Sequence, residues 1–106
     1  MNIYLYISKG YFDSNYIKTA LSAFHSFSFS TVEKHKDLFK IIKQLEKKIE
    51  VVPKEFRFTE IRENSFAVLV FYDGKDEVAE SIIKYCYEKN KLLILKHLPY
   101  EDIYAE

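Results

Sequence analysis

The chain has 106 residues, with 16 Lys and Arg balanced by 16 Asp and Glu, and 48% of its residues are hydrophobic. This length suits one domain with a single core, here residues 1–106 with a short acidic tail at 100–106. The composition excludes a disordered or fibrous chain. Because the net charge is zero, neither nucleic acid nor an anionic membrane is an expected partner. The longest apolar run, 66–72, is far too short to cross a bilayer.

Cysteine and histidine usage narrows the chemistry further. Cys86 is the only cysteine, so no internal disulfide forms, which suits a reducing compartment. The three histidines His25, His35 and His97 have no paired spacing, so we predict no metal site. The N-terminal residues do not resemble a signal peptide. We therefore expect a soluble cytoplasmic protein.

The first half of the chain predicts two strands around a helix. Residues 3–7 are β-branched or aromatic and predict a strand. Asp13 or Ser14 can cap the next helix, whose apolar positions within 17–24 recur at helical spacing. Residues 27–31 alternate between serine and bulkier side chains, which predicts a second strand with one buried face.

The middle of the chain predicts a long helix. Residues 30–33 fit a capping box, and an apolar stripe then runs from Leu38 to Ile49, ending before Pro53. Residues 56–58 alternate as a short edge strand would, and 59–64 fit one helical turn.

The last third predicts two more strands. Residues 66–72 are apolar on both faces, which is typical of a central strand covered on both sides. After a turn at Asp73 and Gly74, apolar positions within 79–86 predict a helix ending near Asn90, with Cys86 in the core. Residues 92–95 predict another apolar strand.

Strands that alternate with helices predict a small three-layer, flavodoxin-like α/β domain. We expect a mostly parallel sheet of four to five strands in the order 2-1-3-4. Ligands of such sheets bind at the carboxyl ends of the strands, where the strand order reverses. That rule brings residues 8–11 and 72–75 together across one crevice. Both glycines of the chain, Gly10 and Gly74, fall in these loops, although glycine also serves turns alone. Asp73 and Gly74 are thus candidate ligand-binding residues.

Four acids follow the predicted central strand, namely Asp73, Asp76, Glu77 and Glu80. Asp76 and Glu77 are best explained as first-turn residues that complement the helix dipole. Glu80 lies a turn deeper, and a carboxylate there could stabilise positive charge growing on a sugar ring. No phosphate-binding P-loop or dinucleotide fingerprint is present, and we predict no cofactor.

Two related families resemble this pattern. Residues 3–8, Asp13 and the helix at 17–24 resemble the opening of TIR domains, and Gly10-Tyr11-Phe12 after the first strand resembles nucleoside 2-deoxyribosyltransferases. Residues 61–65, Glu80 and 91–95 are similar to the second half of both. Both families cleave N-glycosidic bonds of nucleosides or nicotinamide dinucleotide.

This resemblance implies that Glu80 is the catalytic glutamate and that Tyr6, Ser8, Gly10 and Tyr11 line a nucleotide pocket. NAD would enter as a substrate only. Deoxyribosyltransferases usually carry a glycine where Ile82 stands, and the chain is short for either family.

Two hypotheses remain open at this point. The chain is a nucleotide- or nucleoside-handling domain that acts on an N-glycosidic bond with Glu80, or it is a non-catalytic interaction or regulatory module of the same fold. The placement of Gly10, Gly74 and Glu80 favours the first, and Ile82 and the short length favour the second. In the second case a protein partner would dock on Tyr-rich surfaces or on the basic face of the long helix, and the apolar edge at 56–58 is the candidate seam of a dimer.

Overall fold

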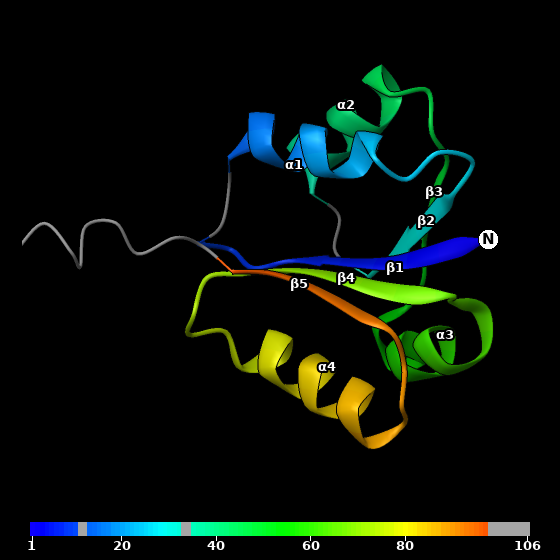
Figure 1. The fold of residues 1–106 in the computed structure, drawn as a ribbon, viewed down its shortest axis with the longest axis vertical. Coiled ribbons are helices and arrows are strands. Elements are labelled where there is room, and N and C mark those ends of the chain that lie inside the picture. Colours follow the sequence, from blue (N-terminus) through cyan, green and yellow to red (C-terminus); the bar gives the residue numbers. More distant parts are fainter. Residues whose placement is uncertain (11–12, 33–34, 98–106) are drawn as a thin grey trace, which may run out of the picture.

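One parallel sheet organises the computed structural model, which describes residues 1–10, 13–32 and 35–97. The strands are β1 (Asn2–Ile7), β2 (Ser28–Thr31), β3 (Ile49–Val51), β4 (Ala67–Tyr72) and β5 (Leu93–His97). The helices are α1 (Ser14–Ser22), α2 (Lys36–Gln44), the 3-10 turn η1 (Lys54–Phe56), α3 (Arg57–Asn64) and α4 (Glu77–Glu88). Helices α1 and α2 cover one face of the sheet, and α3 and α4 cover the other (Figure 1). The predicted three-layer α/β class is confirmed.

The strand order is β3-β2-β1-β4-β5, and every neighbouring pair is parallel. Four strands have the predicted neighbours, namely β2, β1, β4 and β5. The additional strand β3 lies beyond β2, so the complete order differs from the predicted 2-1-3-4. The chain leaves β1 towards one face and β4 towards the other (Figure 1), which makes the β1–β4 boundary the switch point of a doubly wound sheet.

The prediction of a helix that extends to Ile49 is wrong in its last part, because α2 ends at Gln44. Glu46 adopts a left-handed conformation with φ 56°. The N–H of Lys47 donates to the Ile42 carbonyl at 3.1 Å, and that of Glu46 donates to the Lys43 carbonyl at 3.0 Å. These two bonds form a Schellman motif, which stops a helix. Ile49 is therefore free to pair with Phe29 in β3.

The capping box predicted at 30–33 is also wrong. Ser30 lies inside β2, where its buried hydroxyl accepts a hydrogen bond from the Asn2 amide at 2.8 Å. The N-cap of α2 is instead His35, whose Nδ1 accepts from the N–H of Leu38 at 3.3 Å. A neutral imidazole nitrogen is an acceptor, so it can replace the usual cap oxygen.

The edge strand predicted at 56–58 does not form. Phe56 closes the 3-10 turn η1, and Phe58 lies in α3, where its ring packs against Tyr85 with centroids 4.7 Å apart. The alternation of aromatic and charged side chains at these positions is helical here, because Arg57 is buried on the inner face of α3.

Three local predictions are confirmed. Asp13 caps α1 by accepting from the N–H of Tyr16 at 3.0 Å. Strand β4 lies between β1 and β5 and is buried on both faces. Helix α4 buries Ala79, Ile82 and Cys86, and it ends before Asn90, which has φ 53°.

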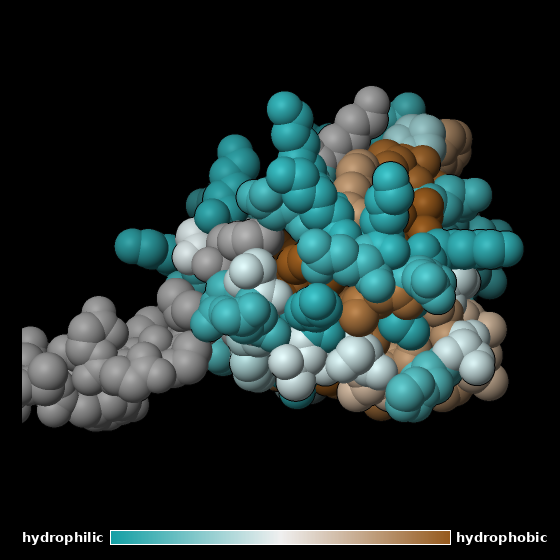
Figure 2. All heavy atoms as spheres, turned by 90° about the horizontal axis from the view of Figure 1, so that it is seen from above, coloured by the Kyte–Doolittle hydropathy of each residue, from teal (hydrophilic) through white to brown (hydrophobic). Residues whose placement is uncertain are grey.

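The core is divided by the sheet into two clusters. Leu69 and Phe71 of β4 belong to the cluster beneath α1 and α2, whereas Val68 and Val70 belong to the cluster beneath α3 and α4. The outer surface over α1 and α2 is largely hydrophilic (Figure 2). In the described part of the chain, no helix has the length and apolar character needed to cross a membrane.

The thiol of Cys86 is expected to be unreactive in the folded protein. Its side chain is buried, and this loss of solvation raises its pKa to about 11, although the charge of Lys91 lowers it in part. Since the thiolate is the reactive form, native protein should resist a thiol-specific chromogenic disulfide and react fully only in strong denaturant. Fast native reaction at neutral pH would contradict this burial.

Candidate functional site

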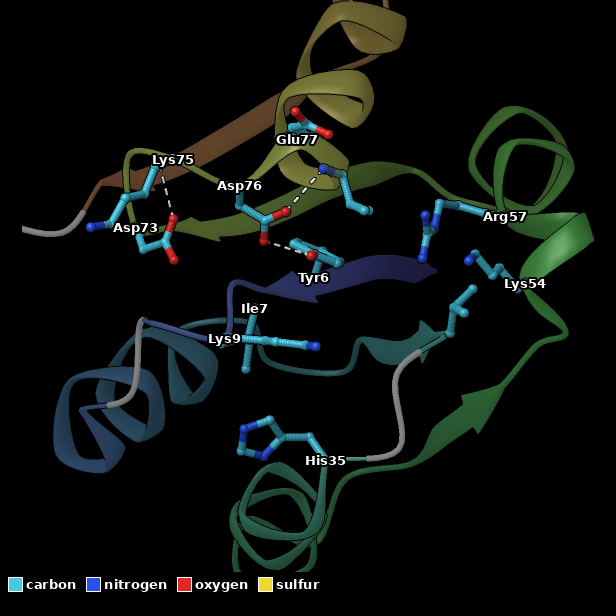
Figure 3. A pocket seen from close by; sticks show the side chains of 12 residues that line it. Tyr6, Ile7, Lys9, His35, Lys54, Arg57, Asp73, Lys75, Asp76 and Glu77 are labelled. Atoms are coloured by element: carbon cyan, nitrogen blue, oxygen red, sulfur yellow. Dashed lines mark hydrogen bonds between the residues drawn. The ribbon is translucent and has the colours of Figure 1, made fainter.

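A crevice of about 840 Å³ lies over the carboxyl ends of β1, β2 and β4. It therefore covers the switch point at which ligands of doubly wound sheets bind. Residues from four stretches of the chain line it (Figure 3), namely Tyr6, Ile7, Lys9, Val32, His35, Lys54, Arg57, Asp73, Lys75, Asp76, Glu77 and Val78.

The two glycine loops meet at one side of this crevice. The N–H of Gly10 donates to Asp73 Oδ2 at 3.1 Å, and Asp73 Oδ1 accepts from the N–H of Lys75 at 3.0 Å. A Cβ on Gly10 would lie only 2.7 Å from Asp73 Oδ2, so a side chain there would displace the carboxylate. Gly74 has φ 94°, a backbone angle that residues with a side chain rarely adopt. The two glycine loops therefore lie together, as the sequence predicts.

Asp76 is the best-held carboxylate of the crevice. It is the N-cap of α4, where Oδ1 accepts from the N–H groups of Val78 and Ala79 at 2.9 and 3.2 Å. The Tyr6 hydroxyl donates to Oδ2 at 2.6 Å. Partial burial raises the pKa of Asp76, but the hydroxyls of Tyr6 and nearby Ser8 and the two N–H groups outweigh it and lower the pKa. Asp76 is thus ionised at neutral pH, and its oxygens already accept hydrogen bonds from within the domain.

Asp76→Ala is expected to lower the free energy of unfolding at neutral pH by about 1–2 kcal/mol, since it removes an N-cap. Because folding lowers the pKa of Asp76 below its ordinary 3.8, its contribution is present above that pH and is lost as pH falls through the lower folded value. Asp76→Asn is the matched control, because asparagine also caps helices but carries no charge. Denaturation by urea at several pH values should show that the Asn variant retains most of the stability. Its free energy of unfolding should also fall less in acid than that of the parent. Equal losses for Ala and Asn at neutral pH would contradict the capping role.

Arg57 is the buried cation of the crevice. It is 6% exposed, and its Nε donates to the Tyr4 hydroxyl at 3.0 Å. The guanidinium also lies over the Tyr6 ring, 5.8 Å from its centroid. Figure 3 shows the side chain extending from the start of α3 into the crevice, near Lys54. Tyr4 and Tyr6 therefore fix a planar cation at one end of the site.

The charges of the crevice are unevenly distributed among its segments. The acids Asp73, Asp76 and Glu77 come with Lys75 from the connection between β4 and α4, whereas Lys54 and Arg57 come from η1 and the start of α3 on the other side (Figure 3). Two of the acids are engaged in internal hydrogen bonds, at Gly10 and at the start of α4. The side of Lys54 and Arg57 therefore favours an anion, the acids offer acceptors at the other side, and Lys9 lies between the two at the end of β1 (Figure 3).

The residues predicted from sequence fall into three groups. Tyr6 and Asp73 line the crevice, and Gly10 and Gly74 shape its rim. The Ser8 hydroxyl is buried close to Asp76, but it forms no hydrogen bond with any group of the described residues. Tyr11 lies outside the residues that the structure describes, as does the acidic tail at 100–106.

Glu80 is not among the residues that line the crevice. It is exposed on the first turn of α4, and its Oε2 accepts from the Tyr72 hydroxyl at 2.6 Å. The structure thus separates the predicted catalytic glutamate from the group around Tyr6.

Sequence reasoning missed several polar residues of the lining, among them Lys54, Arg57 and His35. Pro53 does indicate a break before η1, but the alternation at 56–58 hides the helical position of Arg57. His35 gave no recognisable sign because imidazole is a rare helix cap. Among the described residues, no group of His, Cys, Asp and Glu could hold a metal ion.

Comparisons with protein-family models, with curated protein sequences and with solved structures give no match to this chain. The functional argument therefore rests on the geometry of the crevice.

Proposed function

We propose that this domain binds a nucleotide, a nucleoside that carries at least one phosphate, in the crevice at the carboxyl ends of β1 and β4. The observation that supports the proposal best is the buried guanidinium of Arg57, held by Tyr4 and Tyr6 and extending into the crevice. Guanidinium groups donate parallel hydrogen bonds that match phosphate oxygens.

The two walls suit the two ends of such a ligand. Phosphate oxygens bind at Arg57 and Lys54, at η1 and the start of α3, and Lys9 adds a third positive charge from the end of β1. Sugar hydroxyls donate to the carboxylates of the opposite wall, of which Asp73 and Asp76 are the nearest to β1. A volume of about 840 Å³ is within the range of small-molecule sites. The charge distribution therefore orients the ligand across the switch point.

Cleavage or transfer of an N-glycosidic bond by Glu80 is a further part of this proposal. Tyr72 holds the Glu80 carboxylate on the exposed side of α4, so a sugar reaches it only if the ligand extends past the rim. This geometry supports binding more strongly than turnover. A domain that binds and does not cleave is a regulatory module, and the cytoplasm is its expected compartment.

Proton NMR of the protein with ADP, with NAD, and with a deoxynucleoside plus a free base tests the proposal. Selective broadening of ADP signals supports nucleotide binding, and no broadening of either ADP or NAD signals would refute it. Released nicotinamide or exchanged base that disappears in Glu80→Gln would add catalysis. Glu88→Gln, at the exposed far end of the same helix, is the matched control and should behave as the parent.

Docking of a protein partner or a second copy is the alternative proposal. Phe56 supports it, because this large apolar side chain is 52% exposed in η1. If the segment forms a dimer seam, light scattering should give a dimer that Phe56→Ser converts to a monomer. A monomeric parent chain at high concentration would exclude the dimer.

A further inference from the structure

A second cavity, of about 680 Å³, lies at the opposite end of the sheet from the crevice. The amino ends of β1, β2 and β3 form it together with the last turns of α3, at the end marked N in Figure 1. We call it the amino-end pocket. The residues that its chemistry depends on are Asn2, Ile49, Glu50, Lys48, Glu60 and Asn64.

Glu60 is the unusual group of this pocket. Glu60 is 7% exposed, yet among the described residues no Lys, Arg or His nitrogen lies within ion-pair distance of its carboxylate. Within the described part of the chain, its two oxygens accept only from the side-chain amides of Asn64 and Asn2, at 2.9 and 3.4 Å. A carboxylate has about four acceptor positions, so these amides leave capacity unused. Buried charges in proteins are normally paired.

We propose that the amino-end pocket binds the cationic head of a small amphipathic group, an ammonium or guanidinium on a short apolar stem, with Glu60 as its counter-ion. Such a head supplies the missing positive charge and donates to the remaining carboxylate positions. The half-buried side chain of Ile49 offers apolar surface to the stem. The group is either a free metabolite or an arginine or lysine side chain of a protein.

The charge of the pocket favours a cation over an anion. Glu50 and Glu60 both line it, and Lys48 is the only cation of its lining among the described residues. Lys48 is exposed and forms no ion pair with either acid, so its ammonium competes for Glu60 without occupying it. The crevice at the other end of the sheet has the opposite character, with Arg57 buried in it.

The test is an NMR titration of isotope-labelled protein with N-acetyl-arginine amide, with agmatine, and with N-acetyl-citrulline amide. Citrulline has nearly the shape of arginine but no charge. We expect the two guanidinium compounds to shift the side-chain amides of Asn2 and Asn64 and the backbone amides of 49–50, and citrulline to shift none. Stronger binding of blocked arginine points to a protein side chain, and stronger binding of agmatine points to a free metabolite.

Two variants make the assignment specific. Glu60→Gln keeps the size and one acceptor and should weaken binding at least about tenfold, since the charge-assisted bond is lost. Lys48→Met should strengthen binding, because it removes the competing ammonium, and it tests the proposal even if Glu60→Gln folds poorly. Glu63→Gln, exposed on the same helix, is the matched control and should change nothing. Equal responses to arginine and citrulline, or unchanged affinity in Glu60→Gln, would overturn the proposal without affecting the crevice.

Discussion

Replacing Phe71 with alanine is expected to lower the free energy of unfolding by about 3–5 kcal/mol. Phe71 has no exposed surface and lies in β4, where it pairs with Ile7 of β1 and with Lys96 of β5. Its ring also meets the Tyr16 ring edge to face, with centroids 6.3 Å apart. Truncation therefore opens a cavity under α1 in the middle of the sheet. Domains of this kind are stable by about 5–15 kcal/mol, so the loss is a large share of the total.

Urea denaturation followed by circular dichroism measures this effect. The midpoint should fall while the slope of the free energy against denaturant stays the same, because the folded and unfolded surfaces change little. Phe56→Ala is the matched control, since that ring is 52% exposed in η1, and it should cost less than about 1 kcal/mol. Similar losses for the two variants would mean that Phe71 is not a central core residue.

The ends of two helices show how far the sequence predicts the fold. Helix α4 ends in a Schellman motif at Asn90, and asparagine is a common residue at this left-handed position. Helix α2 ends in the same motif at Glu46, a residue type that gives no such indication. Ile49 then continues the helical spacing of the apolar stripe, so the pattern extends the helix into β3. The sequence did not predict β3, because pairing with β2, a tertiary interaction, determines the backbone conformation there.

The inner face of α3 explains why much of the candidate site was missed. The buried residues Arg57, Glu60 and Ile61 recur at helical spacing, but only one of them is apolar. Hydrophobic periodicity therefore cannot detect this face. The same face presents Arg57 to the crevice and Glu60 to the amino-end pocket, so one short helix supplies the buried charge of both cavities.

The glycine loops were predictable because their requirement is local and topological. Parallel strands place their carboxyl ends together, and only two glycines exist to serve the turns there. The meeting of Gly10 and Asp73 follows from those two facts. The direction in which Glu80 faces does not, since it depends on how α4 packs and on the Tyr72 hydroxyl.

Replacing Arg57 with methionine is expected to weaken ADP binding by about 10–100-fold. Hydrogen bonds to charged groups contribute about 1.5–3 kcal/mol, and each 1.4 kcal/mol is a factor of ten in affinity. Methionine keeps much of the apolar stem of Arg57 but supplies neither a donor nor the guanidinium that lies over the Tyr6 ring. Adenosine, which has no phosphate, should bind the parent and the variant about equally. Calorimetric titration of both ligands separates the phosphate contribution from the rest of the site.

Two further variants distinguish this role from a structural one. Arg57→Lys keeps the charge but loses the planar fork, so its ADP affinity should lie between those of the parent and the methionine variant. Arg62→Met changes an exposed arginine of the same helix, paired with Glu63 at 2.7 Å, and should leave ADP affinity unchanged. Thermal melts give the separate cost of leaving the Tyr4 hydroxyl without its Arg57 donor. If methionine at position 57 weakens ADP and adenosine equally, Arg57 supports the fold and does not contact the phosphate.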